Sequence, residues 1–454
     1  MKKWFQRILF YVVAPGFLSC NQGNTEDYQL VIVNASLLNV KTGVIEKNKS
    51  VFIKNGLINK ISKTRNSDYS LKNVINAKER LLTPSFIDVH NHLNFIFGDT
   101  TEITNPEDFQ ISRGLLTEEY MPYGVTVVRS AAGRESHIPM ERSWMKHHPD
   151  YIDYYPSGGA LVSLNTQFYN HVYVRDSLEV KSKIEEYSKS GIKHIKVYSL
   201  IGEAELNTAI RTAENLDMNI FGHIENAMVS IETACELGLR NFEHVKTLFL
   251  DVVKKYETTS MDLSGLPPDD DENWRFREYE VFNFIGTNDP SIMALIMLLK
   301  KSKASVTPTL HLYAQPIGLT HPATKIEIHP DDKLNWQGEK LNRAKMGYEV
   351  LAALVLKLYK NGIILNTGSD TYEPGKTILS EMLLLNKLGI PMNEVLKIAS
   401  LNSARSINLE KSYGSIEVGK KAHLILFEES PLNNPLNLLS KKTIIKDGIV
   451  WRPL

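Results

Sequence analysis

The chain has 454 residues, which is long enough for one large domain and a smaller module. Hydrophobic residues make up 43 % and charged residues 23 %, as in an ordinary globular protein. The 52 basic and 52 acidic residues cancel, which argues against a nucleic-acid-binding protein, and the only cysteines, Cys20 and Cys235, exclude a disulfide framework.

The first twenty residues have the pattern of a secretory signal. Three basic residues precede an apolar run at 8–19 that is too short to span a bilayer. The run ends in Gly-Phe-Leu-Ser-Cys, which resembles the lipobox of bacterial lipoproteins. We therefore predict export, a lipid on Cys20, and a polar tether at 21–27 that holds the protein at the outer membrane or the periplasmic face. The alternative is a plain signal peptide with a chance cysteine.

The two ends of the remaining chain share one sequence pattern, and the middle has a different one. Residues 28–83 and 406–454 contain short apolar runs with Lys-Asn-Gly and Lys-Asp-Gly turns, which predict one small β-sandwich built from both ends. Residues 84–405 alternate between strand-like and helical patterns. Eight such alternations predict an α/β fold, a (β/α)₈ TIM-like barrel. An open doubly wound sheet has the same periodicity, and the placement of polar residues decides for the barrel.

Eight strands are expected in this middle region, with helices between them. The helical spacing of apolar residues is clear at 178–190, 203–216, 227–237 and 378–388. The strand-like runs end near the following residues: His92, Arg129, Ser163, Tyr198, His223, Val245, Leu310 and Asp370.

The first expected strand of the barrel ends in a pair of histidines. His90 and His92 are two residues apart, so they face the same side of a strand, as two ligands of one metal would. The carboxyl end of a barrel strand is its active-site face. By itself the pair is a weak signal, because surface histidines also occur at strand ends.

Four more strands end in polar residues of the same chemical kind. Lys196 lies between two apolar residues, and inside a barrel its charge would be costly unless something changes it; the alternative is a lysine that reaches out to solvent. His223 and His244 each follow a strand, where each could be a core histidine. Asp370 follows an apolar strand, where it could be a helix N-cap. The imidazoles and the carboxylate among them are the ligand types that Zn²⁺ and similar metals prefer.

The order His-x-His, Lys, His, His, Asp on successive strands resembles the amidohydrolase superfamily, and more closely its imidazolonepropionase- and prolidase-like branch. The resemblance covers nearly all of the chain after the signal, including residues 82–88, 399–404 and 414–420. The sequence departs from the family at His423, where an aspartate is usual at a structural position.

The resemblance implies a centre with two divalent metals, expected to be Zn²⁺. It assigns one metal to the first histidine pair and the aspartate, the second to the other two histidines, and a bridge to the lysine as its CO₂-derived carbamate: His90, His92 and Asp370; His223 and His244; Lys196. It further implies that a hydroxide between the metals attacks a carbonyl. Asp370 then acts as the catalytic proton acceptor and passes the proton to the leaving nitrogen.

The expected reaction is hydrolysis of an amide or peptide-like C–N bond, in a dipeptide or an N-acyl amino acid. Arg129, His171 and Tyr198 are predicted to contact the substrate, and Arg129 or Arg175 could pair with its carboxylate if neither is simply a surface arginine. Residues 247–288 are long for a connection and could cover the site. The alternatives are a cyclic amide hydrolase of the imidazolonepropionase type and a catalytically inactive surface binding lipoprotein; the sequence leaves a homo-oligomer open.

Overall fold

The computed structural model describes residues 27–453 except 167, 226, 257–264, 266–273, 327 and 329–332. The predicted signal, the lipid-bearing Cys20 and nearly all of the tether lie outside the described residues. Within the described part of the chain, none of the helices has both the length and the apolar character needed to cross a membrane.

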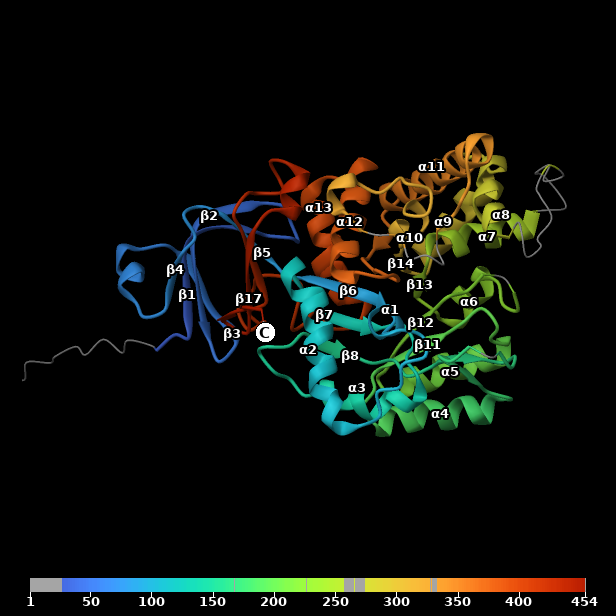
Figure 1. The fold of residues 1–454 in the computed structure, drawn as a ribbon, viewed down its shortest axis with the longest axis horizontal. Coiled ribbons are helices and arrows are strands. Elements are labelled where there is room, and N and C mark those ends of the chain that lie inside the picture. The colour runs from blue at the N-terminus through green and yellow to red at the C-terminus, as the bar shows by residue number, and fades with distance from the viewer. Residues whose placement is uncertain are drawn as a thin grey trace, which may run out of the picture.

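Strands from both ends of the chain form one sheet (Figure 1, left). The order is β18-β17-β16-β5-β1-β2-β3, and β4 pairs with β1. The strands are β1 (Leu30–Leu38), β2 (Ile45–Lys54), β3 (Leu57–Lys63), β4 (Val74–Asn76), β5 (Leu81–Pro84), β16 (Leu424–Phe427), β17 (Lys442–Lys446) and β18 (Ile449–Val450). The two ends meet where β5 pairs antiparallel with β16. A second layer that would make this sheet a sandwich stays a prediction.

Two parallel sheets fill the middle of the chain. One has the order β6-β7-β8 and the other β10-β9-β11-β12-β13-β14-β15. Their strands are β6 (Phe86–Asn91), β7 (Val125–Ser130), β8 (Asp153–Tyr155), β9 (Ala160–Val162), β10 (His171–Tyr173), β11 (His194–Val197), β12 (Asn219–Gly222), β13 (Asn241–Glu243), β14 (Ser305–Thr307) and β15 (Ile364–Leu365). The prediction of an α/β fold with parallel strands is confirmed.

The segment that follows β15 is hydrogen-bonded to β6, the first strand of the three-stranded sheet. Val89 N donates to the Thr367 carbonyl at 3.0 Å, and Ser369 N donates to the His90 carbonyl at 3.1 Å. These bonds bring the last strand of the middle region beside the first, although complete closure of a barrel stays a prediction.

Helices lie between the parallel strands and cover them (Figure 1). They are α1 (Asn94–Phe97), α2 (Phe109–Tyr120), α3 (Ile138–Trp144), α4 (Ser177–Lys189), α5 (Glu203–Asn215), α6 (Ile231–Leu237), α7 (Val245–Tyr256), α8 (Trp274–Glu280), α9 (Pro290–Lys301), α10 (Leu310–Ala314), α11 (Gly338–Lys360), α12 (Pro374–Lys387), α13 (Met392–Lys397) and α14 (Ser403–Ser406). Much of the long connection at 247–288 is therefore helical, in α7 and α8, and its acidic run at 269–272 lies outside the described residues.

Capping side chains and a proline explain where three of these helices begin. The Asp176 side chain accepts hydrogen bonds from the backbone of Leu178 and Glu179 and starts α4 within a residue of the expected position. The expected helix at 227–237 starts later, because Ser230 accepts from Thr233 N and makes Ile231 the first residue of α6. A proline at the first turn of α12 starts that helix four residues before the apolar pattern shows it.

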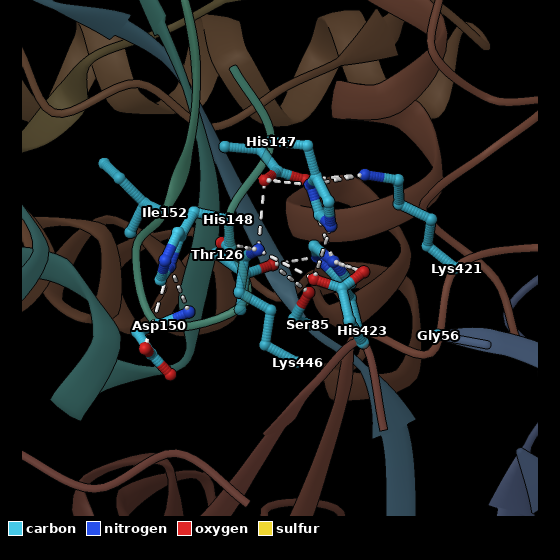
Figure 2. A network of polar contacts seen from close by, with 12 residues as sticks. Gly56, Ser85, Thr126, His147, His148, Asp150, Ile152, Lys421, His423 and Lys446 are labelled. Carbon is cyan, nitrogen blue, oxygen red and sulfur yellow. Dashed lines mark hydrogen bonds and ion pairs between the residues drawn. The ribbon is translucent and has the colours of Figure 1, made fainter. Parts of the chain in front are cut away.

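A buried polar network joins the terminal sheet to the parallel strands (Figure 2). His423 lies just before β16, where its ring contacts Thr126 Oγ1 at 2.9 Å and Asp447 Oδ1 at 3.2 Å. Lys446 on β17 reaches Asp153, the first residue of β8, at 3.0 Å. Because an imidazole has two ring nitrogens, His423 can bond to both parts of the protein at once.

Candidate metal centre

Six polar residues reach one cavity from five different strands. His90 is on β6, Lys196 is on β11, and the other four follow the carboxyl ends of β6, β12, β13 and β15: His92, His223, His244 and Asp370. All six line a cavity of about 720 Å³. Since parallel strands bring their carboxyl ends to one side, residues far apart in the sequence meet there.

The tightest group consists of two histidines and the aspartate. One ligand atom from each of His90, His244 and Asp370 lies within 4.8 Å of the others. His90 Nε2 and His92 Nε2 are each 3.5 Å from Asp370 Oδ1, and His244 Nδ1 is 3.6 Å from Oδ2. The His223 ring lies 4.7 Å from that of His244. The histidines and the carboxylate predicted as ligands therefore form one continuous cluster.

Burial keeps these histidines neutral. It lowers the pKa of His92 to about 3, and it lowers the pKa values of His90 and His244 well below the ordinary value. A neutral imidazole has one nitrogen with a free lone pair, which is the form that binds a metal. The cluster is therefore in the protonation state that metal binding requires.

Lys196 is the most unusual member of the cluster. Its residue is 1 % exposed, and among the described residues its Nζ has no hydrogen-bond partner. Its Nζ lies 5.2 Å from the centre of the Phe221 ring. Burial, opposed by Glu243 and assisted by Arg129, lowers the pKa of Lys196 to about 8, so a neutral amine is accessible near neutral pH. A buried amine without a hydrogen-bond partner is rare in folded proteins and needs an explanation.

Two of the site residues follow their strands in a left-handed backbone conformation. His244 has φ 62° and Asp370 has φ 48°. Residues other than glycine rarely adopt such angles, and they are often found where function needs a particular side-chain direction. The amide of Asp370 donates to the His90 carbonyl at 2.9 Å, which holds the turn against β6.

Sequence reasoning did not identify two buried carboxylates beside these residues. Asp88 accepts from His90 N at 2.9 Å, from Ser369 Oγ at 2.6 Å and from Tyr120 OH at 2.8 Å, so it ties β6 to the turn that carries Asp370. Glu243 contacts His90 Nδ1 at 2.7 Å. Both stand next to or within the recognised motifs, but nothing in their spacing distinguishes them from solvated acids.

The residues predicted to contact the substrate divide into two groups. His171 and Tyr198 line the cavity, with ring centres 4.7 Å apart, and Tyr198 stacks near His223 at 4.3 Å. The structure does not place Arg129 there. Its residue is 1 % exposed, and it donates to the Val89 carbonyl and to Glu243 beneath the site. The other candidate, Arg175, lies just before α4. Its side chain is exposed and pairs with Glu179 outside the cavity.

Aromatic and charged side chains form the rest of the cavity wall. The aromatic ones are Phe95, Phe168, Tyr169, Trp274, Tyr279 and Tyr313. Lys246, the second residue of α7, is paired with Glu278 of α8, and Glu225 adds a second carboxylate. The wall therefore offers apolar surface together with charges of both signs.

Residues 292–450, which include Asp370, match the amidohydrolase family. The resemblance to the amidohydrolase superfamily that the sequence predicts is confirmed over this stretch. It is 22 % identical over 443 residues to a 5'-deoxyadenosine deaminase of Methanobrevibacter smithii, covering 94 % of this chain and 89 % of that protein. It is also 22 % identical over 447 residues to an imidazolonepropionase of Clostridium tetani, covering 90 % and 92 %.

Several solved structures share the fold of this chain. A Xaa-Pro dipeptidase with bound methionine has a TM-score of 0.66 at 18 % identity, covering 93 % of this chain and 99 % of that one. The ochratoxinase of A. niger has a TM-score of 0.65 at 15 % identity, covering 94 % and 96 %. With the family match, the site supports a hydrolase that acts on carbon–nitrogen bonds.

Proposed function

We propose that this protein hydrolyses the C–N bond of a dipeptide or an N-acyl amino acid at a centre with two divalent metals. The observation that carries the proposal is Lys196, a buried amine without a hydrogen-bond partner in the described structure and surrounded by metal-ligating side chains. A lone buried ammonium is unfavourable, whereas an anion between two dications is not.

The chemistry of the donors fits such a centre. The four histidines and the aspartate expected as ligands line the same cavity, and we assign them to the metals as the family resemblance implies: His90, His92 and Asp370 for one, His223 and His244 for the other. The neutral amine of Lys196 would form an N–C bond with carbon dioxide and release one proton, which leaves a carbamate anion. Divalent ions held there supply a water of lowered pKa and polarise a carbonyl.

Residues of the chain itself would move the proton. Asp370 has both carboxylate oxygens turned to the histidines, and its residue is 8 % exposed, so it can accept a proton inside the cavity and release it to a leaving nitrogen. Tyr198 and His171 stand along the wall next to His223, where they can contact the substrate close to the reacting bond.

The charges of the wall favour a zwitterionic substrate. Lys246 and its ion-pair partner Glu278 place a positive and a negative charge on the wall, Glu225 adds a carboxylate 3.4 Å from His223, and the aromatic side chains cover an apolar part. A dipeptide has all three features. A cyclic amide hydrolase of the imidazolonepropionase type is the second candidate, since one relative bears that name. That type has one metal and no carbamate, so Lys196 counts against it.

The remaining predictions complete the picture of an anchored enzyme. We propose that the parallel strands close into one barrel, which the hydrogen bond between Val89 and Thr367 supports. We also propose that 84–405 is this barrel, that the two ends share the smaller domain, and that a lipid on Cys20 holds the protein at the outer membrane or the periplasmic face. An inactive binding lipoprotein would not need a complete set of ligand side chains.

Metal analysis followed by a substrate screen tests the proposal. Protein grown with zinc and bicarbonate should contain about two divalent metals per chain, and it should cleave members of a dipeptide and N-acyl amino acid library. The same library with amidated carboxyl ends is the matched control, and we expect weaker cleavage of it. A metal content of one or none, or cleavage of imidazolone rings and no peptides, would contradict the proposal.

A further inference from the structure

A buried pair of opposite charges lies directly beneath the candidate metal centre. Arg129 on β7 donates to Glu243 Oε1 at 2.7 Å, and the other oxygen of Glu243, Oε2, lies 2.7 Å from His90 Nδ1. Both residues of the pair are 1 % exposed, and neither lines the cavity. The pair therefore touches a candidate ligand from below and has no direct access to a substrate.

The backbone after β13 explains how the carboxylate reaches this place. Consecutive residues of a strand normally point to opposite faces. His244 has φ 62°, and this left-handed turn lets both Glu243 and His244 approach the same partner, His90. The ring centres of His90 and His244 are 4.7 Å apart. One dipeptide of the chain thus supplies a candidate ligand and a support for the ligand opposite.

The carboxylate determines which nitrogen of His90 faces the cavity. A Glu243 oxygen at 2.7 Å from Nδ1 accepts a hydrogen bond from it, so the proton stays on Nδ1 and the lone pair on Nε2. That Nε2 is the atom that lies 3.5 Å from Asp370. A carboxylate behind a histidine ligand is a known way to orient the ring and increase its basicity.

The arginine holds the carboxylate in place. A buried carboxylate needs a counter-charge and hydrogen-bond donors to offset its loss of solvation. Arg129 supplies the charge, donates a further hydrogen bond to the Val89 carbonyl, and has its guanidinium 3.3 Å from the centre of the Phe221 ring. These contacts fix the guanidinium to β6 and β12, so the strands that carry the site also hold its support.

We propose that Glu243 and Arg129 are positioning residues that set the tautomer and orientation of His90 for metal binding. The inference rests on the proposed function, because it needs a metal at His90. It assigns to Arg129 a role different from substrate binding, and it predicts that loss of the pair weakens metal affinity before it alters any contact with the substrate.

The test measures zinc affinity of the full chain by competition with a chelator, and the absorption spectrum of the cobalt-loaded protein. Gln at position 243 has one acceptor oxygen for two donors, so Glu243→Gln should bind zinc about 10–100-fold more weakly and shift the cobalt bands. Glu280→Gln is the control, since Glu280 is buried and bonds to Arg343 at 2.7 Å outside the cavity. The zinc affinity of Glu280→Gln should stay within about twofold of the wild-type value, whereas loss of a residue that supports a metal ligand should change it more.

Three results would overturn the inference. If folded Glu243→Gln and Arg129→Met both bind zinc like the wild type, the pair does not position a ligand. If the wild type binds no metal at all, the proposed function fails, and this inference fails with it. If the variants do not fold, the ¹⁵N spectrum of histidine-labelled wild-type protein still decides: His90, assigned by its loss in His90→Gln, must have its proton on Nδ1, and a proton on Nε2 refutes the proposal.

Discussion

Replacement of Asp153 by asparagine should destabilise the protein without touching the metal centre. Asp153 begins β8, at the opposite end of the strands from the ligands, and it is buried between the terminal sheet and the parallel strands. Its carboxylate accepts from Tyr413 OH at 2.6 Å and lies 3.0 Å from Lys446 Nζ and 3.1 Å from Lys421 Nζ. Asparagine preserves the size of the side chain and removes the charge.

The expected loss is about 3 kcal/mol in the free energy of unfolding. Removal of one partner from a buried ion pair costs about 3–5 kcal/mol, because the other charge stays buried. Lys446 is fully buried, but it keeps Asp447 at 2.9 Å and the His148 carbonyl at 2.9 Å. The lower end of the range therefore applies. Lys421→Met is the control, because Lys421 is a more exposed partner of Asp153. It should lower the free energy of unfolding by about 1 kcal/mol or less.

Urea unfolding of both proteins in the same metal state measures this difference at pH 7 and in acid. Burial alone would raise the pKa of Asp153, but the hydrogen bond with His147 and the charge of Lys446 hold it well below the ordinary value. A carboxyl group whose pKa is lowered by folding stabilises the folded protein at pH values above its unfolded pKa, which is about 3.9. This stabilisation is lost as the pH falls through the folded pKa. The difference between wild type and variant should therefore shrink below about pH 4. A loss below about 1 kcal/mol at pH 7 would refute the reasoning.

Three further outcomes follow from the site and the N-terminus. Lys196→Ala should lose at least about 100-fold in turnover and regain part of it with short carboxylic acids, measured by kinetics with and without propionate; near-normal turnover would make Lys196 a structural residue. When free metal is present at about 1,000 times its Kd, its removal by a chelator should lower the free energy of unfolding by about 4 kcal/mol. An unchanged denaturation curve would show that no metal stabilises the fold. Mass spectrometry of the native protein should find lipid on an N-terminal Cys20, and Cys20→Ser should leave the membrane fraction; a variant that stays with membranes would show that the anchor lies elsewhere.

Much of the order of elements was predictable because several strands combine an apolar run with a polar residue at the end. The strand that leads to His223 and the helix at 203–216 both appear within two residues of their expected limits. Exact helix limits were less accessible. The start of α6 depends on the side chain of Ser230, which caps the helix, and apolar spacing contains no information about such a bond.

The candidate ligands could be found from sequence because the ends of parallel strands converge in any fold of this class. Glu243 and Arg129, which support these ligands from beneath, could not be found in this way. Arg129 was considered as a partner for a substrate carboxylate, and it does bind a carboxylate, but the one it binds is Glu243. An arginine at a strand end has the same appearance in the sequence in both cases. Only the position of Glu243, which depends on the left-handed turn at His244, decides between them.

This difference has a consequence for how variation at the site should be interpreted. Lys246 lines the cavity from α7, and it can be exchanged without loss of any contact to the histidines. Glu243 lies three positions before Lys246 in the sequence. It cannot be exchanged in this way, since both of its oxygens are engaged with buried donors. Substitutions at 246 should therefore alter which substrate is cleaved, and substitutions at 243 should alter whether a metal is held. The two effects separate experimentally, because the first changes KM for carboxylate-bearing substrates and the second changes metal content.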